Sequence, residues 1–334
     1  MESTYTREDL LAAHDELIDA VDETGAQPAA SANQVRTDGG ERRAPPLVVK
    51  IGGARAVDPE GAIADVAHLV ANGREVVVVH GGSTAVDETL ERLGIDPTYV
   101  ETPGGVTGRF TDAETMSVFS MVMAGKLNTE LTVAFRNAGV DALGLSGVDG
   151  GLLTGPRKSA VRVLEDGKKK IKRGDHSGKI TDVNVDLLTG VLADGYTPIV
   201  SVPILGEESD GSVTAVNADA DRSAAAIAGA LGGELVLLTD VSGIYADPDD
   251  PDTLIDAATT PAELDAIESA AEGFMTKKVM AATEALSGGA TTAIVSDANA
   301  DKPIVSAVNG AGTHIDASAL ATESAGSDPA EVDQ

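Results

Sequence analysis

Two glycine-rich turns in the sequence could bind an anion. The stretch KIGGA places Lys50 two residues before Gly52-Gly53, and HGGS places Gly81-Gly82 after a second apolar run. Glycine pairs let backbone N–H groups converge on an anion without a Cβ in the way. One pair alone indicates a tight turn, but two in succession, the first beside a lysine, predict a phosphate site. A third glycine turn, TDVSGIYADP (239–248), follows a late apolar run.

The usual nucleotide-binding motifs do not account for these turns. The sequence contains no GxxxxGK[ST], no GxGxxG after the first apolar run and no protein-kinase signature. A phosphate site in this chain would therefore use a different arrangement of glycine turns and cations.

Two further motifs bring acids and lysines to helix starts. NADADRSAAAIAG places Asn217, Asp219 and Asp221 at alternate positions where a helical pattern begins. Acids there are typical of an N-cap and of the first turn, where they complement the helix dipole. GFMTKK carries the doublet Lys277-Lys278, which by itself would be an ordinary pair on a helix surface.

Arg109 stands in GRFTDAET, just before a sequence with the form of a capping box. An arginine fixed there could bind a carboxylate through two parallel hydrogen bonds. Without other motifs, a surface arginine would be the simpler interpretation.

The segment from Arg157 to Lys179 concentrates positive charge. It carries nine basic residues against three acidic ones, a local net charge of +6 in a chain whose formal net charge is −30. A solvent-exposed face would carry charges of both signs, so the excess of positive charge in this segment predicts a binding partner. The basic residues are Arg157, Lys158, Arg162, Lys168, Lys169, Lys170, Lys172, Arg173 and Lys179.

Short apolar runs alternate with helical patterns and would position all these residues. This alternation predicts an α/β fold with a mostly parallel sheet and helices on both faces, and ligands then bind beyond the carboxyl ends of the strands. AVRVL and KKIKR, on either side of Glu165-Asp166-Gly167, predict an antiparallel hairpin that carries the basic segment. The predicted strands are LVVKI (47–51), EVVVV (75–79), VDALGL (140–145), TPIVSVPIL (197–205), ELVLLT (234–239) and TTAIVS (291–296).

Composition narrows the class of protein. The 334 residues include no Cys and five dispersed His, so no thiolate metal site exists and no zinc spacing is evident. No apolar run approaches the ~20 residues that span a bilayer, and the N-terminus lacks a basic signal region, which predicts a cytoplasmic protein. The excess of 54 acidic over 24 basic residues is typical of proteins adapted to high salt. The negative electrostatic field of such an acidic chain repels the phosphates of nucleic acid.

The two ends of the chain differ from the middle. Residues 8–23 have helical periodicity and precede a Pro- and Gly-bearing linker, so residues 1–46 are interpreted as an N-terminal extension. A frayed extension is the simpler interpretation, and a helix at an oligomer interface is the alternative. Residues 316–334 are expected to form an acidic disordered tail.

The motifs KIGG, HGGS, GRFTD, NADAD, TDVSGI and GFMTKK together resemble the amino-acid kinase family, in order and spacing, over about residues 47–315. The chain is most similar to the acetylglutamate kinases and to the kinases of glutamate or 2-aminoadipate held on the LysW carrier protein. The resemblance implies a three-layer αβα sandwich, with an amino-acid lobe (47–212) and an ATP lobe (213–315). It also implies ATP with Mg²⁺, and a hairpin over the substrate site.

The resemblance also implies roles for individual residues. Lys50 and Lys278 would be the catalytic cations, with Lys277 as a small ambiguity, and Asp221 would hold them in place, with Asp219 as the alternative. Gly81, Gly82, Arg109 and Asn217 would bind the amino-acid substrate, Arg109 through its α-carboxylate. Phosphates and nucleotide would be bound by Gly52, Gly53, Thr239, Asp240, Gly243 and Tyr245. No dedicated metal ligand is expected.

The basic hairpin favours a substrate tethered to an acidic carrier over a free one, because complementary charge steers encounter. Lys168, Lys169, Lys170, Lys172 and Arg173 are the expected carrier-binding residues, and a homo-oligomer, a dimer, is expected. Three alternatives stay open: a kinase of free N-acetylglutamate, a relative such as aspartokinase or glutamate 5-kinase, and a nucleic-acid-binding protein. The second alternative is disfavoured because the sequence shows no regulatory module after the kinase-like region. The third is disfavoured because no aromatic residues are interleaved with the lysines.

Overall fold

The computed structural model describes residues 44–52, 59–103, 105, 107–165, 167–271 and 273–320. The predicted helix at 8–23, its linker and Gly53 lie outside the described residues. Within the described part, no helix is long and apolar enough to cross a membrane.

One large sheet forms the centre of the fold, in the order β12-β14-β13-β11-β1-β2-β9-β6-β7, and β5 and β10 also pair with β9. The neighbours β11, β1, β2 and β9 are all parallel, as are β5 and β9. The mostly parallel α/β fold is thereby confirmed. Its principal strands are β1 (Leu47–Ile51), β2 (Val76–His80), β5 (Ala142–Gly147), β6 (Leu153–Glu165), β7 (Lys168–Gly178), β9 (Thr197–Glu207), β11 (Glu234–Thr239) and β13 (Thr292–Asp297).

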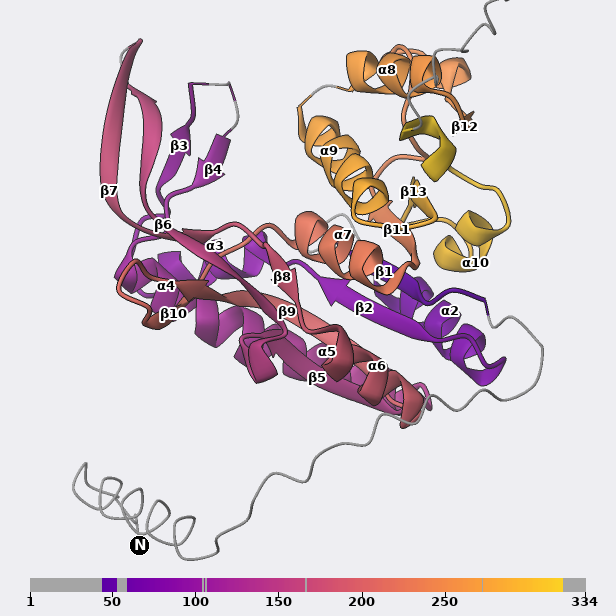
Figure 1. The fold of residues 1–334 in the computed structure, drawn as a ribbon, viewed down its shortest axis with the longest axis horizontal. Coiled ribbons are helices and arrows are strands. Elements are labelled where there is room, and N and C mark those ends of the chain that lie inside the picture. Colours follow the sequence, from indigo (N-terminus) through magenta and orange to yellow (C-terminus); the bar gives the residue numbers. More distant parts are fainter. Residues whose placement is uncertain are drawn as a thin grey trace, which may run out of the picture. The chain divides into compact units, whose positions relative to one another are not determined.

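Helices cover both faces of this sheet (Figure 1). On one face, α3, α4, α6, α7, α8 and α9 contribute to one buried cluster, and on the other α2, α5 and α10 contribute to a second. Their bounds are α2 (Pro59–Ala71), α3 (Ser83–Arg92), α4 (Ala113–Ser120), α5 (Asn128–Asn137), α6 (Val185–Ala193), α7 (Ala220–Leu231), α8 (Pro261–Ala270), α9 (Phe274–Ser287) and α10 (Pro303–Val308).

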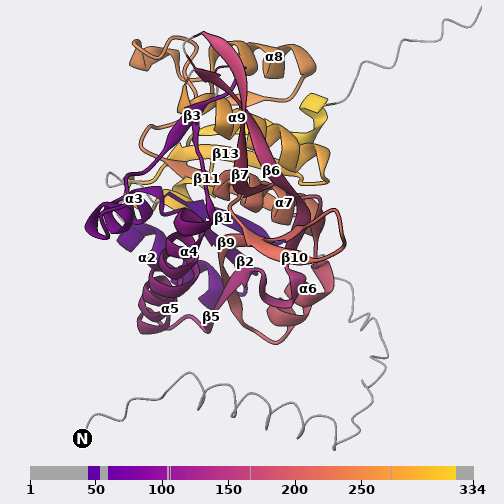
Figure 2. The same ribbon diagram turned by 90° about the vertical axis from the view of Figure 1, so that its left-hand side faces the viewer.

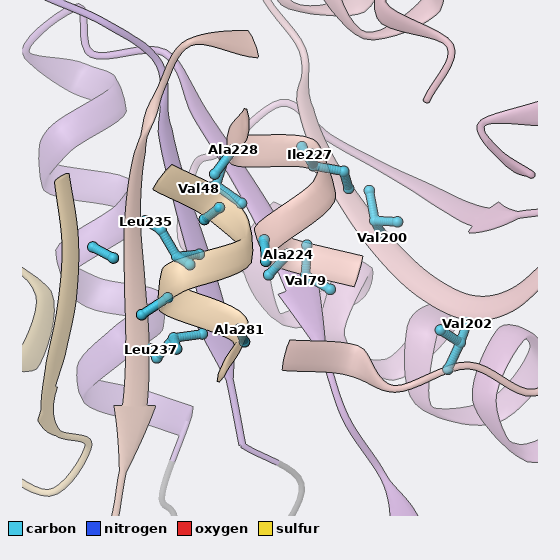
Figure 3. Close-up of a cluster of buried hydrophobic side chains, with 14 of the residues drawn as sticks. Val48, Val79, Val200, Val202, Ala224, Ile227, Ala228, Leu235, Leu237 and Ala281 are labelled. Atoms are coloured by element: carbon cyan, nitrogen blue, oxygen red, sulfur yellow. The ribbon is translucent and has the colours of Figure 1, made fainter. Parts of the chain in front are cut away.

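The two clusters follow from the alternation of side chains along each central strand. In β1, Val48 faces the cluster under α7 while Val49 faces the cluster under α2. Leu235 and Val236 of β11 divide in the same way. Figure 3 shows the first cluster, in which small residues of α7 and α9 meet the valines and leucines of the sheet. Alanine-rich helices lie close to the sheet here, which brings their first turns near the ends of the strands.

The antiparallel hairpin predicted around Glu165-Gly167 is confirmed and is longer than expected, because β6 and β7 remain paired from Glu165↔Lys168 to Arg157↔Gly178. A second, unpredicted hairpin is formed by β3 (Tyr99–Glu101) and β4 (Thr107–Arg109). The two hairpins rise side by side from one end of the sheet (Figure 1; Figure 2).

Other differences from the sequence prediction are local. The segment DAETMSVFSMVMAGKL (112–127), whose pattern predicts one α-helix, forms α4 and then a π-helical stretch, Met121–Leu127. The short strands β8 (Asp182–Val183), β10 (Val213–Val216), β12 (Ala257–Ala258) and β14 (Thr313–Asp316) were not predicted. Residues Ala317–Leu320, expected to belong to a disordered tail, form a 3₁₀ turn in which Ala319 is buried and the Ser318 hydroxyl donates to the carbonyl of Thr259.

Candidate active site

Two buried lysines meet one buried carboxylate at the carboxyl end of β1. Lys50 Nζ lies 2.7 Å from Asp221 Oδ1, and Lys278 Nζ lies 3.3 Å from Asp221 Oδ2. The side chains are 10%, 12% and 13% exposed for Lys50, Lys278 and Asp221. Lys278 donates a hydrogen bond to Oδ2, and Lys50 forms an ion pair with Oδ1. Lys50 and Lys278 lie 171 and 57 positions away from Asp221 in the sequence, and the fold brings all three together.

Local sequence explains why these three side chains meet. Lys50 follows Val48 by two residues in β1 and therefore points to the face covered by α7 and α9. Asp221 lies in the first turn of α7. Lys278 lies near the start of α9, which packs against α7.

Burial and charge oppose one another in this cluster. Burial alone would raise the pKa of Asp221, but the charges of Lys50 and Lys278 and their contacts hold it below its usual value. The pKa of Lys278 is lowered by burial and then by the charge of Lys50, while Asp221 opposes both effects. The carboxylate therefore allows two ammonium groups to stay close together away from water.

The neighbours of these residues make different contacts. Asp219 is the N-cap of α7 and accepts hydrogen bonds from the backbone N–H groups of Asp221 and Arg222. Lys277 Nζ donates to the carbonyl of Thr107 in β4, 3.0 Å away. The structure thus brings Asp221 and Lys278, rather than Asp219 and Lys277, to Lys50.

A second cluster joins the base of the basic hairpin to the GRFTD and NADAD segments. Asn217 Nδ2 donates to Thr111 Oγ1 at 3.0 Å. Asp175, 1% exposed, accepts from the Thr111 N–H at 3.1 Å and from the Ser177 hydroxyl. Backbone bonds join His176 to both Thr111 and Asn217. Asn217 and the loop that carries Arg109 are therefore held as one unit with the hairpin.

Arg109 is buried in a network of its own. Its Nη1 donates to Asp87, and its Nη2 donates to the carbonyl of Ser83 and to the hydroxyl of Tyr99, both at 3.1 Å. The guanidinium also lies 5.3 Å from the centre of the Tyr99 ring. Because Ser83 directly follows Gly82, these contacts bring Arg109 to the second glycine turn.

That turn, HGGS, is held by specific contacts. The N–H of Gly81 donates to the carbonyl of Ile51, which ties the second turn to the first. A Cβ on Gly82 would lie 2.3 Å from a methyl carbon of Leu127 and 2.7 Å from the sulfur of Met123, so a larger residue there would require these side chains of the π-helical stretch to move. His80 is 1% exposed, and burial lowers its pKa to about 4.

The residues expected to bind nucleotide lie near the end of β11. Thr239 is buried and donates to Asp240, and Tyr245 pairs with Leu254 in an isolated bridge. A Cβ on Gly243 would lie 2.7 Å from Thr313 Oγ1, so packing is sufficient to explain this glycine. Gly52 follows β1 directly.

The five carrier-binding candidates lie on β7 but differ in their surroundings. Lys168, Lys169 and Arg173 are exposed. Lys170 forms an ion pair with Glu165, and Lys172 Nζ lies 4.1 Å from the centre of the Phe110 ring. Lys172 is thus directed toward the GRFTD segment rather than toward solvent.

Sequence reasoning did not find Asp87, Tyr99, Asp175 or His80. Asp87 resembles an ordinary acid on an amphipathic helix, and Tyr99 lies in a short strand with no clear period. A signal was available for Asp175, because it is an isolated acid inside a strongly basic segment. For His80, the signal was its place at the end of a continuous apolar run.

Comparisons with known proteins agree with this arrangement. The sequence model of the amino acid kinase family matches residues 45–297. LysW-aminoadipate kinase of Deinococcus radiodurans is 40% identical over 269 residues, which cover 80% of this chain and 90% of that protein. Acetylglutamate kinase of Methanopyrus kandleri is 39% identical over 253 residues, covering 75% of this chain and 94% of that protein.

Solved structures show the same fold. Carbamate kinase of Giardia lamblia bound to AMP-PNP has a TM-score of 0.60 at 15% identity and covers 82% of this chain and 98% of its own. N-acetylglutamate synthase of Neisseria gonorrhoeae has a TM-score of 0.64 at 24% identity, and the match covers 82% of this chain and 60% of the synthase. From its sequence match and its fold, the chain belongs to the amino acid kinase family.

Proposed function

We propose that the protein transfers the γ-phosphoryl group of ATP to the side-chain carboxylate of an N-blocked glutamate or 2-aminoadipate carried on a LysW-type carrier protein. The product is an acyl phosphate, an intermediate of arginine or lysine biosynthesis. Relatives named LysW-aminoadipate kinase, at 38–40% identity over most of the chain, support this assignment.

The observation that carries the proposal is the pair of buried lysines around Asp221. The reaction brings a carboxylate against a triphosphate, so it requires positive charge at the point where the phosphoryl group moves. Lys50 and Lys278 supply two ammonium groups within 3.3 Å of one carboxylate, at the strand ends where ligands of such sheets bind. Asp221 contacts both lysines and holds them in place.

The nucleophile needs no general base, because a carboxylate is ionised at neutral pH. The nearby His80 is suited to packing rather than to proton transfer. Its Nε2 lies 3.2 Å from the amide nitrogen of Asn128, which donates to it, and its Nδ1 faces the Gly81 carbonyl at 3.1 Å. The neutral ring is therefore engaged on both sides.

ATP is expected to bind with Mg²⁺, which neutralises phosphate charge when bound. Within the described residues, no three His, Asp or Glu side chains converge to hold an ion. In kinases, Mg²⁺ is usually held by substrate phosphates together with one or two carboxylates. Asp240, next to Thr239 at the end of β11, is the carboxylate that we propose for an additional contact.

The substrate end of the site is proposed to consist of Arg109, Asn217 and the glycine turn at Gly81-Gly82. Arg109 reaches this turn through Ser83, and Asn217 reaches the Arg109 loop through Thr111. The exposed Lys168, Lys169 and Arg173 of β7 would then contact an acidic carrier. We further propose a cytoplasmic homodimer that works at high salt, in keeping with the acidic composition.

The assignment can be tested by trapping the acyl phosphate with hydroxylamine. The purified full-length protein is incubated with ATP, Mg²⁺ and each of three substrates: carrier-linked glutamate, carrier-linked 2-aminoadipate and free N-acetylglutamate. We expect a hydroxamate with a carrier-linked substrate at a far higher kcat/KM than with N-acetylglutamate. The reverse ranking would make the protein a kinase of free N-acetylglutamate, and no hydroxamate with any substrate would refute carboxyl phosphorylation.

A further inference from the structure

Asp87 and Tyr99 complete a closed ring of hydrogen bonds with Arg109. Asp87 accepts from Arg109 Nη1 through Oδ1 and from the Tyr99 hydroxyl through Oδ2, the latter at 2.7 Å. The Tyr99 oxygen in turn accepts from Arg109 Nη2. We propose that Asp87 and Tyr99 form an internal substitute for the substrate carboxylate, which occupies Arg109 in the free protein and lowers its affinity for the substrate. This inference rests on the proposed role of Arg109 as the substrate anchor.

The hydrogen bonds that Arg109 already makes leave no pair of neighbouring N–H groups free to bind a carboxylate. An arginine holds a carboxylate through two neighbouring N–H groups, and Nη2 takes part in this contact together with either Nη1 or Nε. Here Nη2 already donates to the Ser83 carbonyl and to Tyr99, and Nη1 donates to Asp87. The side chain is also only 5% exposed. A substrate carboxylate must therefore replace one of these partners.

Tyr99 is the partner that can leave most easily. The Ser83 carbonyl belongs to the backbone of the first residue of α3 and cannot move without moving the glycine turn. Tyr99, in contrast, is 50% exposed and lies on β3, which pairs with β4 alone in a separate two-stranded sheet. Its hydroxyl can stay on Asp87 while the substrate takes its place on Nη2.

Asp87 adds an electrostatic cost to substrate binding. Its carboxylate neutralises Arg109 in the free protein, so the incoming carboxylate becomes a second anion beside a single cation. An Asn at this position would still accept from Nη1 but would carry no charge. Asp87→Asn should therefore strengthen binding, whereas a residue that only supports the fold would weaken binding or leave it unchanged when substituted.

The test measures dissociation constants by calorimetry, with carrier-linked glutamate and N-acetyl-L-glutamate as probes and with ATP in parallel. We expect Asp87→Asn to tighten the binding of the amino-acid probes by roughly two- to fivefold. Tyr99→Phe, which keeps the ring over Arg109, should tighten it by roughly two- to fivefold. ATP binding should hardly change. Asp141→Asn is the matched control, since Asp141 pairs with Arg136 on the exposed surface.

A double-mutant cycle then shows whether the effect acts through Arg109. We expect Arg109→Ala to weaken amino-acid binding and to abolish the gain from Asp87→Asn. Weaker or unchanged binding in Asp87→Asn, or a gain that persists without Arg109, would overturn the inference while leaving Arg109 as the anchor. If Arg109→Ala leaves amino-acid binding unchanged, both this inference and the proposed substrate site are wrong.

Discussion

Replacing Asp221 by Asn removes the carboxylate charge that contacts both ammonium groups. Two unit charges 3.3 Å apart, the distance from Asp221 to Lys278, interact by about 5 kcal/mol at an effective dielectric constant of about 20. The pKa of Lys278 is already lowered by burial and by Lys50, and loss of Asp221 lowers it further. Lys278 should then lose its proton within the working pH range, and phosphoryl transfer should lose one of its two cations.

The consequence is a specific pH dependence of the rate. We expect the activity of the wild-type protein to fall as the pH rises through the pKa of Lys278, and in Asp221→Asn this fall should move to lower pH. Near pH 8 we expect kcat to drop by about 10²–10³, the usual loss for one electrostatic group in such a site. Part of the loss should be regained toward pH 6, and both KM values should change little.

The assay is the initial rate of ADP release between pH 6 and 9, with Asp219→Asn as the matched control from the same helix turn. Asn is as good an N-cap as Asp, and the charge of Asp219 affects the pKa of Lys278 less than that of Asp221, so Asp219→Asn should change activity and pH dependence far less. A loss in Asp221→Asn that is the same at every pH would refute the electrostatic reasoning. Finding the pH-dependent loss in Asp219→Asn instead would exchange the roles of the two acids.

Three further outcomes are expected. Because burial lowers the pKa of His80 from 6.5 to about 4, the free energy of unfolding should fall by about 3 kcal/mol as the pH drops through this range, and urea titrations of His80→Gln should lack this fall. Asp65→Ala should lower the free energy of unfolding by about 1–3 kcal/mol in the same assay, because the buried carboxylate accepts the first two N–H groups of α10. The third variant replaces the exposed hairpin residues Lys168, Lys169 and Arg173 together by Gln. It should reduce kcat/KM for a carrier-linked substrate at least about tenfold but leave turnover of saturating N-acetylglutamate nearly unchanged. An equal loss on both substrates would make the hairpin a structural lid.

Much of the fold could be predicted because its central strands are continuous apolar runs. LVVKI and ELVLLT match β1 and β11 to the residue, since such runs fit a sheet that is buried on both faces. The short strands β8 and β12, of two residues each, carry no periodicity and were missed. The π-helical stretch was missed as well, because its residues continue the helical pattern of α4 without a break.

The candidate site was predictable where the family motifs name residues, and not where tertiary contacts decide. Lys50, Asp221 and Lys278 were chosen from motif spacing, and the fold brings them together. The partners of Arg109 come from a helix and a hairpin that the sequence does not relate to each other. Only the contacts of Asp87 and Tyr99 in the folded protein therefore relate them to Arg109.

The most direct test of the phosphoryl-transfer centre compares the two lysines of GFMTKK. Lys278 contacts Asp221, whereas Lys277 contacts the Thr107 carbonyl. In single-turnover acyl-phosphate formation, we expect Lys278→Ala to be slower by about 10²–10³, while Lys277→Ala keeps a near-normal rate and both variants stay folded. An inactive Lys277→Ala beside a near-normal Lys278→Ala would contradict the proposed site.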